Sequence, residues 1–112
     1  MEELIKGTDE MKITAEKKVT EQMTVNFLKY LQQEEKSAAT IEKYMREVKN
    51  LAYFLQGEDI QKEKIIEYRE KLQQEYQART VNGKLSAINS YLEFSGNEKS
   101  RVRYLKVQHN AF

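Results

Sequence analysis

Residues 77–96 place the strongest constraint on how this 112-residue chain can fold. Four apolar residues recur there at steps of four, three and four: Val81, Leu85, Ile88 and Leu92. This is the spacing of a single apolar stripe along an α-helix. The stretch predicts an amphipathic helix over about residues 78–95, which Gly96 ends.

The opposite side of this stretch carries short polar side chains and one guanidinium: Arg79, Asn82, Ser86 and Asn89. A helix face that only meets solvent usually carries Glu and Lys instead. Gly83 lies among them, although a glycine inside a helix costs about 1 kcal/mol relative to alanine. The pattern indicates a helix that lies against a partner, and our first candidate is a nucleic-acid groove.

Apolar residues at helical spacing predict three earlier helices, over about residues 20–35, 38–56 and 62–76. Ser37 suits the N-cap of the second of these helices and Gly57 its C-terminal stop. The chain has no proline and only four glycines, so the fold class we expect is all-α. The expected core consists of Phe27, Leu31, Ile41, Tyr44, Val48, Leu51, Leu55, Ile65, Leu72, Leu85, Ile88 and Leu92.

Basic charge is unevenly distributed along the chain, although the formal net charge is only +1. Residues 77–112 carry six basic and two acidic groups, and residues 37–55 carry three and two. Between them, residues 56–76 carry four basic and six acidic groups. Two basic blocks therefore flank an acidic one, which modestly favours a polyanionic partner.

The predicted second helix repeats the pattern of the fourth, with Lys43, Arg46 and Asn50 opposite its apolar side. The predicted third helix instead turns an acidic strip outward, which would repel phosphate and which we therefore place away from any DNA. Charged strips opposite an apolar face are also common on helices that only meet solvent, so this alternative stays open at this point.

The two ends of the chain lack sustained apolar periodicity. We expect residues 1–19 to form a flexible arm and residues 97–112 to form a basic linker with mobile ends. No cysteine and a single histidine, His109, exclude a thiolate zinc site and a multi-histidine metal site. We expect no cofactor. No apolar run approaches the ~20 residues of a membrane span, and we expect a cytoplasmic protein.

Seven tyrosines raise the possibility of base-stacking platforms. Four of them, Tyr44, Tyr68, Tyr76 and Tyr91, instead fall on the predicted apolar stripes. We therefore expect them in the core, each with a hydroxyl that can reach a partner.

Two segments resemble known sequence patterns. The segment Ser37-x-x-Thr40-Ile41-x-x-Tyr44-x-x-x-Val48-x-x-Leu51-x-x-Phe54-Leu55 resembles the second helix of the core-binding domain of tyrosine recombinases, the phage integrase family. The segment Ala78-x-Thr80-Val81-Asn82-x-Lys84-Leu85-Ser86-Ala87-Ile88-x-x-Tyr91 resembles the fourth helix of that domain. The basic residues 99–109 resemble the tether that leads to the catalytic domain.

The resemblance implies a SAM-like four-helix domain of two crossed helix pairs over residues 20–96. In the family this domain grips duplex DNA at the recombination site, with its second and fourth helices toward the major groove. The catalytic arginine, His-x-x-Arg pair and nucleophilic tyrosine belong to a separate domain, so we expect no enzyme here. We expect duplex DNA as partner, other protomers in the full-length recombinase, no membrane, and a monomer for these 112 residues.

The residues expected to bind DNA share basic or amide character: Lys43, Arg46, Asn50, Arg79, Thr80, Asn82, Lys84, Ser86, Lys99, Arg101 and Arg103. Lys43, Arg46 and Lys84 are predicted to meet phosphates, while Arg79 and Asn82 are predicted to reach guanine and adenine edges. The family often has two basic residues where this chain has Gly83 and Lys84. The alternative is a helical protein-interaction domain without DNA binding, which would expose apolar residues such as Tyr53, Phe54 or Phe94.

Overall fold

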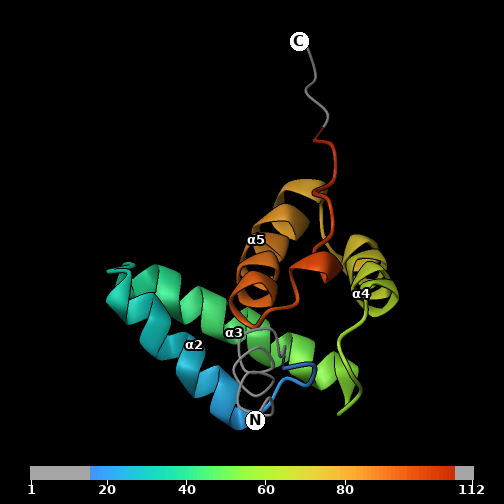
Figure 1. Cartoon of the computed structure of the whole chain (residues 1–112). Helices are drawn as coiled ribbons and strands as arrows, with labels where there is room; N and C mark the ends of the chain where they lie inside the picture. Colours follow the sequence, from blue (N-terminus) through green and yellow to red (C-terminus); the bar gives the residue numbers. More distant parts are fainter. Residues whose placement is uncertain (1–15, 108–112) are drawn as a thin grey trace, which may run out of the picture.

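The computed structural model describes residues 16–107, and these residues form an all-helical fold. The elements are α2 (Glu21–Gln33), α3 (Ala38–Leu55), α4 (Lys62–Glu75), α5 (Ala78–Phe94) and the short 3₁₀ turn η1 (Glu98–Ser100). Figure 1 shows the pair α2–α3 running across the pair α4–α5, with the most extensive contact between α3 and α5. The predicted all-α class is confirmed, and the four predicted helices are present within two residues of their expected ends.

Side-chain caps set where the first two helices begin. The Thr20 hydroxyl accepts a hydrogen bond from the Met23 N–H at 3.0 Å, and the Ser37 hydroxyl accepts one from the Thr40 N–H at 3.1 Å. Each cap satisfies a backbone donor that has no partner inside the helix. The prediction of Ser37 as an N-cap is confirmed.

A left-handed glycine sets where α5 ends. Gly96 has φ +84°, and the next N–H, that of Asn97, donates back to the Leu92 carbonyl at 2.7 Å. This is the backbone geometry that lets the chain turn sharply out of a helix, and glycine adopts it without steric cost. The chain therefore reverses at Gly96 and returns along the helix that it has just left (Figure 1).

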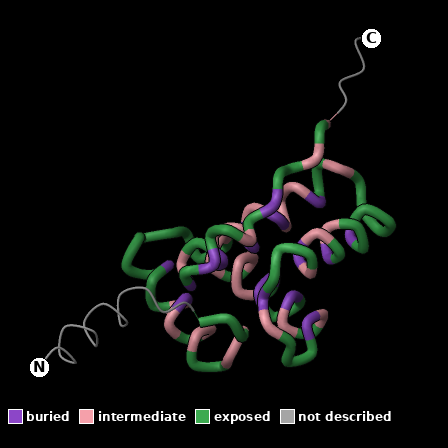
Figure 2. Tube along the Cα trace, turned by 45° about the vertical axis from the view of Figure 1, so that its right-hand side comes forward, coloured by how far each residue is buried: buried purple, intermediate pink, exposed green. Residues whose placement is uncertain are grey.

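One hydrophobic core joins all four helices. Phe27 lies edge-on to the Tyr91 ring, with the ring centroids 5.3 Å apart, at the contact between α2 and α5. Figure 2 shows buried positions alternating with exposed ones along the helical segments, as amphipathic helices require. The buried apolar residues are Phe27, Leu31, Val48, Leu51, Leu55, Ile60, Ile65, Tyr68, Leu72, Val81, Leu85, Ala87, Ile88, Tyr91, Leu92 and Val102.

Three predicted core residues lie at the edge of this core. Ile41 and Tyr44 are only partly buried, because they pack against the outside of the main cluster and not within it. Tyr76 is 42% exposed, because it follows the last turn of α4 and leaves the apolar stripe. Ile60 and Val102 are buried although they lie outside the helices, where helical periodicity gives no signal.

Residues 16–19 lie against the helical domain and not in the separate arm that we expected. The Ile60 N–H donates to the Lys17 carbonyl at 2.7 Å, and the Glu16 N–H donates to the Ser95 carbonyl at 3.2 Å. Residues 1–15 of that arm and residues 108–112 of the expected linker lie outside the described residues. None of the described helices is both long enough and apolar enough to span a membrane.

Candidate nucleic-acid interface

Lys43 of α3 meets Gly83 of α5 where the two helices cross. A Cβ built on Gly83 would lie 2.9 Å from the Lys43 Nζ, which is closer than real Cβ contacts. The missing side chain at Gly83 therefore makes room for the ammonium group of Lys43. Glycine at position 83 costs α5 about 1 kcal/mol of helix propensity relative to alanine, but it lets the Lys43 ammonium group lie against the face of α5.

Two arginines lie one helical turn from this contact. Arg46 follows Lys43 by three residues on α3, and Arg79 precedes Gly83 by four residues on α5. Both arginines are exposed, and within residues 16–107 neither they nor Lys43 form an ion pair. The crossing therefore gathers three positive charges from two helices. Thr80 and Asn50 are exposed on the same two helices.

Small residues continue this face along α5. Gly83, Ser86 and Ser90 follow Arg79 at four, seven and eleven residues, which keeps them on one side of the helix. The Tyr44 hydroxyl of α3 lies 3.3 Å from the Ser86 hydroxyl and fixes one border of the face. Ser86 is therefore partly buried against α3 and is not a freely projecting side chain.

The amide side chains of α5 bind the chain's own tail. The Asn82 Nδ2 donates to the Leu105 carbonyl at 2.8 Å, and its Oδ1 accepts from the Leu105 N–H at 2.7 Å. Asn89 makes the same pair of hydrogen bonds with Val102, at 2.9 and 3.1 Å. The Asn82 oxygen and one amide hydrogen are thus engaged by the tail, and the predicted contact of Asn82 with an adenine edge would compete with these hydrogen bonds.

Helix α4 holds the other side of the same tail. The Lys62 Nζ donates to the Arg101 carbonyl and the Arg69 guanidinium donates to the Arg103 carbonyl, each at 2.8 Å. Val102 is buried between these contacts. Residues 97–107 of the expected linker therefore follow a defined path in contact with α4 and α5.

A shallow groove runs between the tail and the face of α5, with a volume of about 590 Å³. We call it the α5–tail groove, and it is lined by Tyr44, Ser86, Asn89, Ser90, Glu93 and residues 101–104. Arg101 lies 3.7 Å from the Glu93 carboxylate, whereas Arg103 and Lys99 are exposed and form no ion pair within the described residues. The predicted DNA-binding residues Ser86, Arg101 and Arg103 thus lie together around one groove.

Lys84 does not lie on this face, contrary to its predicted contact with phosphate. Its Nζ forms an ion pair with the Glu47 carboxylate at 3.1 Å and lies 4.6 Å from the centre of the Tyr76 ring. The Lys84 side chain is 16% exposed and that of Glu47 only 2%. Glu47 was missed from the sequence, although its position between Tyr44 and Val48 on the apolar side of α3 was a signal.

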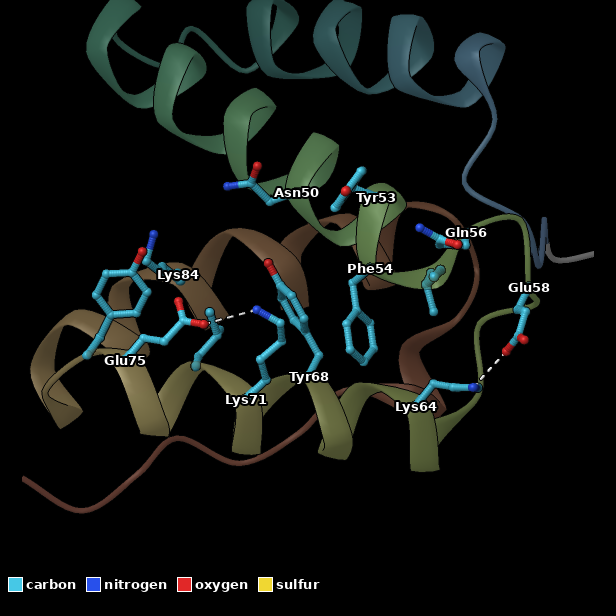
Figure 3. A pocket seen from close by; sticks show the side chains of 13 residues that line it. Asn50, Tyr53, Phe54, Gln56, Glu58, Lys64, Tyr68, Lys71, Glu75 and Lys84 are labelled. Atoms are coloured by element: carbon cyan, nitrogen blue, oxygen red, sulfur yellow. Dashed lines mark hydrogen bonds and ion pairs between the residues drawn. The ribbon is translucent and has the colours of Figure 1, made fainter.

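A second groove, of about 570 Å³, lies between α3, α4 and the start of α5 (Figure 3). We call it the aromatic groove, because Tyr53, Phe54, Tyr68 and Tyr76 line it together with Lys84. Burial, and then the nearby Glu47 carboxylate, raise the pKa of Tyr68 well above its usual range, so its hydroxyl stays protonated. Ion pairs Lys64–Glu58 and Lys71–Glu75 neutralise the charges on its α4 side.

The pairing of charges separates the two grooves. The lysines of the aromatic groove each have a carboxylate partner, and four aromatic side chains line this groove. Around the α5–tail groove and the α3–α5 crossing, Lys43, Arg46, Arg79 and Arg103 have none within the described range. In residues 16–107 no three carboxylate, imidazole or thiol groups gather as a metal ion would require.

Comparison with known proteins places this arrangement in a family. Residues 24–99 match the family model described as the phage integrase, N-terminal SAM-like domain. No curated protein and no solved structure matches the chain. The matched region contains most of α2, all of α3, α4 and α5, and the turn that leads into the tail. The chain therefore belongs to the phage integrase family, and residues 24–99 are its N-terminal SAM-like domain.

Proposed function

We propose that this chain is the DNA-binding domain of a site-specific tyrosine recombinase and grips duplex DNA at the recombination site through α3 and α5. The observation that carries the proposal is the α3–α5 crossing, where Lys43 lies over Gly83 with Arg46 and Arg79 one turn away. Cations without carboxylate partners can neutralise phosphates at little electrostatic cost to the domain itself. Because the chain belongs to the phage integrase family, DNA is the polyanion that we expect on this surface.

The roles of individual residues follow from their surroundings. Lys43 and Arg46 are assigned to phosphates, because neither has a carboxylate partner within residues 16–107. Lys43 presents its ammonium group beside Gly83 of α5, and Arg46 is exposed on α3. Arg79 is assigned to a guanine edge, because it stands in the first turn of α5 beside small residues that let the helix approach a groove. Thr80 is exposed next to Arg79, whereas Asn50 lines the aromatic groove. Lys84 is withdrawn from this set, since its charge is held by Glu47.

The test is a titration of ¹⁵N-labelled protein with short duplexes of several sequences at a series of salt concentrations. About four or five phosphate contacts give a slope of log affinity against log salt of about −4 to −5. For the isolated domain we expect a Kd in the nonspecific range of about 10⁻⁴–10⁻⁶ M. Amide shifts should concentrate on α3, on the first half of α5 and on residues 99–106.

Charge-removal variants give the matched comparison. Lys43→Ala and Arg46→Ala should each make the salt slope shallower by about one. Lys29→Ala removes an exposed lysine from α2 and should leave the slope unchanged. If Lys29→Ala weakens binding as much as Lys43→Ala does, the binding is a diffuse charge effect and the α3–α5 crossing is not the interface.

A second function, a helical protein-interaction domain without DNA binding, is supported by the aromatic groove. Tyr53 stands at its edge with 79% of its surface exposed, whereas Phe54 packs against Tyr68 with ring centroids 5.0 Å apart. Phe94, the third expected exposed residue, packs against Phe27 and Tyr30. Under this reading the titration would show no salt-dependent DNA binding, and DNA would cause no shifts at the crossing.

A further inference from the structure

The tail is held by its main chain, and its outward side chains take no part in that grip. Asn82 and Asn89 each donate to one carbonyl and accept from one N–H of the tail, at Leu105 and Val102. This leaves the side chains of Arg103 and Tyr104 exposed, and both line the α5–tail groove. The asparagines thus fix the backbone position of Arg103 and Tyr104 through main-chain hydrogen bonds at Val102 and Leu105.

The spacing of the two asparagines along α5 matches the spacing of the two tail residues that they bind. Asn82 and Asn89 are seven residues apart on α5, which is a rise of about 10.5 Å along the helix. Val102 and Leu105 are three residues apart in an extended segment, which spans about 10 Å. Because the two lengths agree, the helix can hold the strand at both points without distortion of either. The strand runs antiparallel to α5, with Val102 beside the later asparagine.

We propose that Asn82 and Asn89 are positioning residues for DNA binding, which hold the tail so that Arg103 meets the sugar-phosphate backbone of a duplex lying along the α5–tail groove. The inference rests on the proposed function and assigns these amides a role other than base reading. The charges favour this placement, because Arg103 has no carboxylate partner within residues 16–107, whereas Glu93 at the end of the groove is held by Arg101. The tail groove also continues the face that begins at Arg79 and Gly83.

Positioning and base reading predict different results when an asparagine is removed. An amide that reads a base contributes to one sequence more than to another. An amide that positions a backbone contact contributes equally to all sequences and acts through the salt-dependent part of the affinity. The tail's own amide protons give a third readout that needs no DNA, because Val102 and Leu105 donate to the asparagines.

The experiment compares the wild-type chain with Asn82→Ala, Asn89→Ala and the double variant. Kd is measured for several duplexes of different sequence across a salt series, and hydrogen exchange is measured at the Val102 and Leu105 amides. Gln74→Ala, which removes an exposed amide from the acidic face of α4, is the matched control. Thermal unfolding and amide spectra confirm that each variant keeps the four helices.

We expect faster exchange at both tail amides in the double variant. We also expect an affinity loss of about 3- to 10-fold that is equal for all duplexes, since the Arg103 side chain must then be ordered on binding. The salt slope should become shallower by up to about one. Gln74→Ala should change none of these quantities.

Four outcomes overturn the inference. A loss confined to some sequences with an unchanged salt slope assigns the asparagines to base reading. Faster exchange at the tail with unchanged affinity shows that the tail takes no part in DNA binding. If the wild-type chain binds no duplex, the proposed function fails and this role fails with it. By contrast, DNA binding by wild type with an unaffected double variant removes only the positioning role.

Discussion

Tyr91 and Glu47 are fully buried side chains that each carry one oxygen without a hydrogen-bond partner within residues 16–107. Such a group loses its hydration on folding and gains nothing in return. The two residues differ in charge, however. Tyr91 keeps its proton, whereas the second oxygen of Glu47 is held by Lys84.

Burial, with a smaller contribution from the Glu16 carboxylate, raises the pKa of Tyr91 to about 12. Below pH 10, the ordinary value, the hydroxyl is protonated in both the folded and the unfolded chain and favours neither. Above pH 10 the unfolded chain loses this proton while the folded chain keeps it, so stability falls until the pH passes about 12. The protein should therefore lose stability steeply in this alkaline window.

Tyr91→Phe should remove about 2–3 kcal/mol of this alkaline loss and should be neutral or stabilising at pH 7, since the hydroxyl has no partner among residues 16–107. Urea unfolding at a series of pH values between 8 and 12 measures both effects, with that range taken to bracket the titration. Tyr53→Phe, at a side chain 79% exposed, is the control and should leave the profile unchanged. An unaltered alkaline loss in Tyr91→Phe would assign it to another group.

Lys84→Met should destabilise the fold by about 3–5 kcal/mol, because it leaves the Glu47 carboxylate buried without a counter-charge. Lys71→Met removes a lysine of an exposed pair, where both side chains are about half exposed, and should cost about 0.5 kcal/mol or less. Denaturant unfolding measures the two losses. Adding Glu47→Gln to Lys84→Met should recover part of the stability, and no recovery would show that Lys84 contributes by packing and not by charge.

Helix α5 contacts the core, helix α3 and the tail through three different sides. Its apolar stripe faces the core, its glycine receives Lys43 from α3, and its asparagines hold the tail. This division explains the unusual residues that the sequence shows opposite the apolar stripe. The sequence predicted that this side lies against a partner, and for the asparagines the partner is the chain itself.

Gly83→Ala separates helix propensity from the position of Lys43. Alanine should stabilise α5 by up to about 1 kcal/mol, less whatever it costs to move the Lys43 ammonium aside. In a Lys43→Ala background the full gain should appear, because nothing then stands against the new Cβ. Denaturant unfolding of the four proteins completes the cycle. Equal gains in both backgrounds would show that Lys43 does not need the space above Gly83.

For the whole molecule, the sequence predicted the helices well and the segments between them poorly. Periodicity, a serine cap and a left-handed glycine depend on neighbours in the sequence, so α3 and α5 could be located from the chain alone. The docked tail depends on contacts between residues far apart in the sequence, such as Lys62 and Arg101, which are 39 residues apart. No local pattern announces such contacts, although two asparagines seven residues apart beside an extended segment were a usable sign.

Sequence patterns likewise indicated some features of the candidate site and missed others. Lys43, Arg46 and Arg79 could be proposed from the sequence, because basic residues that recur at helical spacing form a recognisable strip, and their contact with DNA stays a prediction. Lys84 was assigned to phosphate for the same reason, yet it is held by a carboxylate that comes from another helix. Whether a lysine is free or paired is a property of tertiary structure, so sequence alone could not show that Lys84 is paired with Glu47.

At this scale the chemical prediction is that the 112-residue chain forms no covalent bond with DNA. Its only histidine is His109, and no arginine–histidine cluster accompanies any of its seven tyrosines in the sequence. The measurement is incubation with a suicide substrate, a nicked duplex that traps a phosphotyrosine adduct, followed by denaturing electrophoresis. Appearance of a slower band that depends on one tyrosine would contradict the prediction.

The hold on the tail has a consequence for engineering. Because Asn82 and Asn89 bind main-chain atoms, we expect the domain to accept strands of other composition, provided that apolar side chains replace Val102 and Leu105. The outward side chains between and beyond them take no part in this grip, so positions other than Arg103 can be redesigned. We therefore expect that a chimera with a foreign connecting strand bound by Asn82 and Asn89 keeps the same chain path along α5. A domain fused after this strand would then begin at a known position and in a known direction.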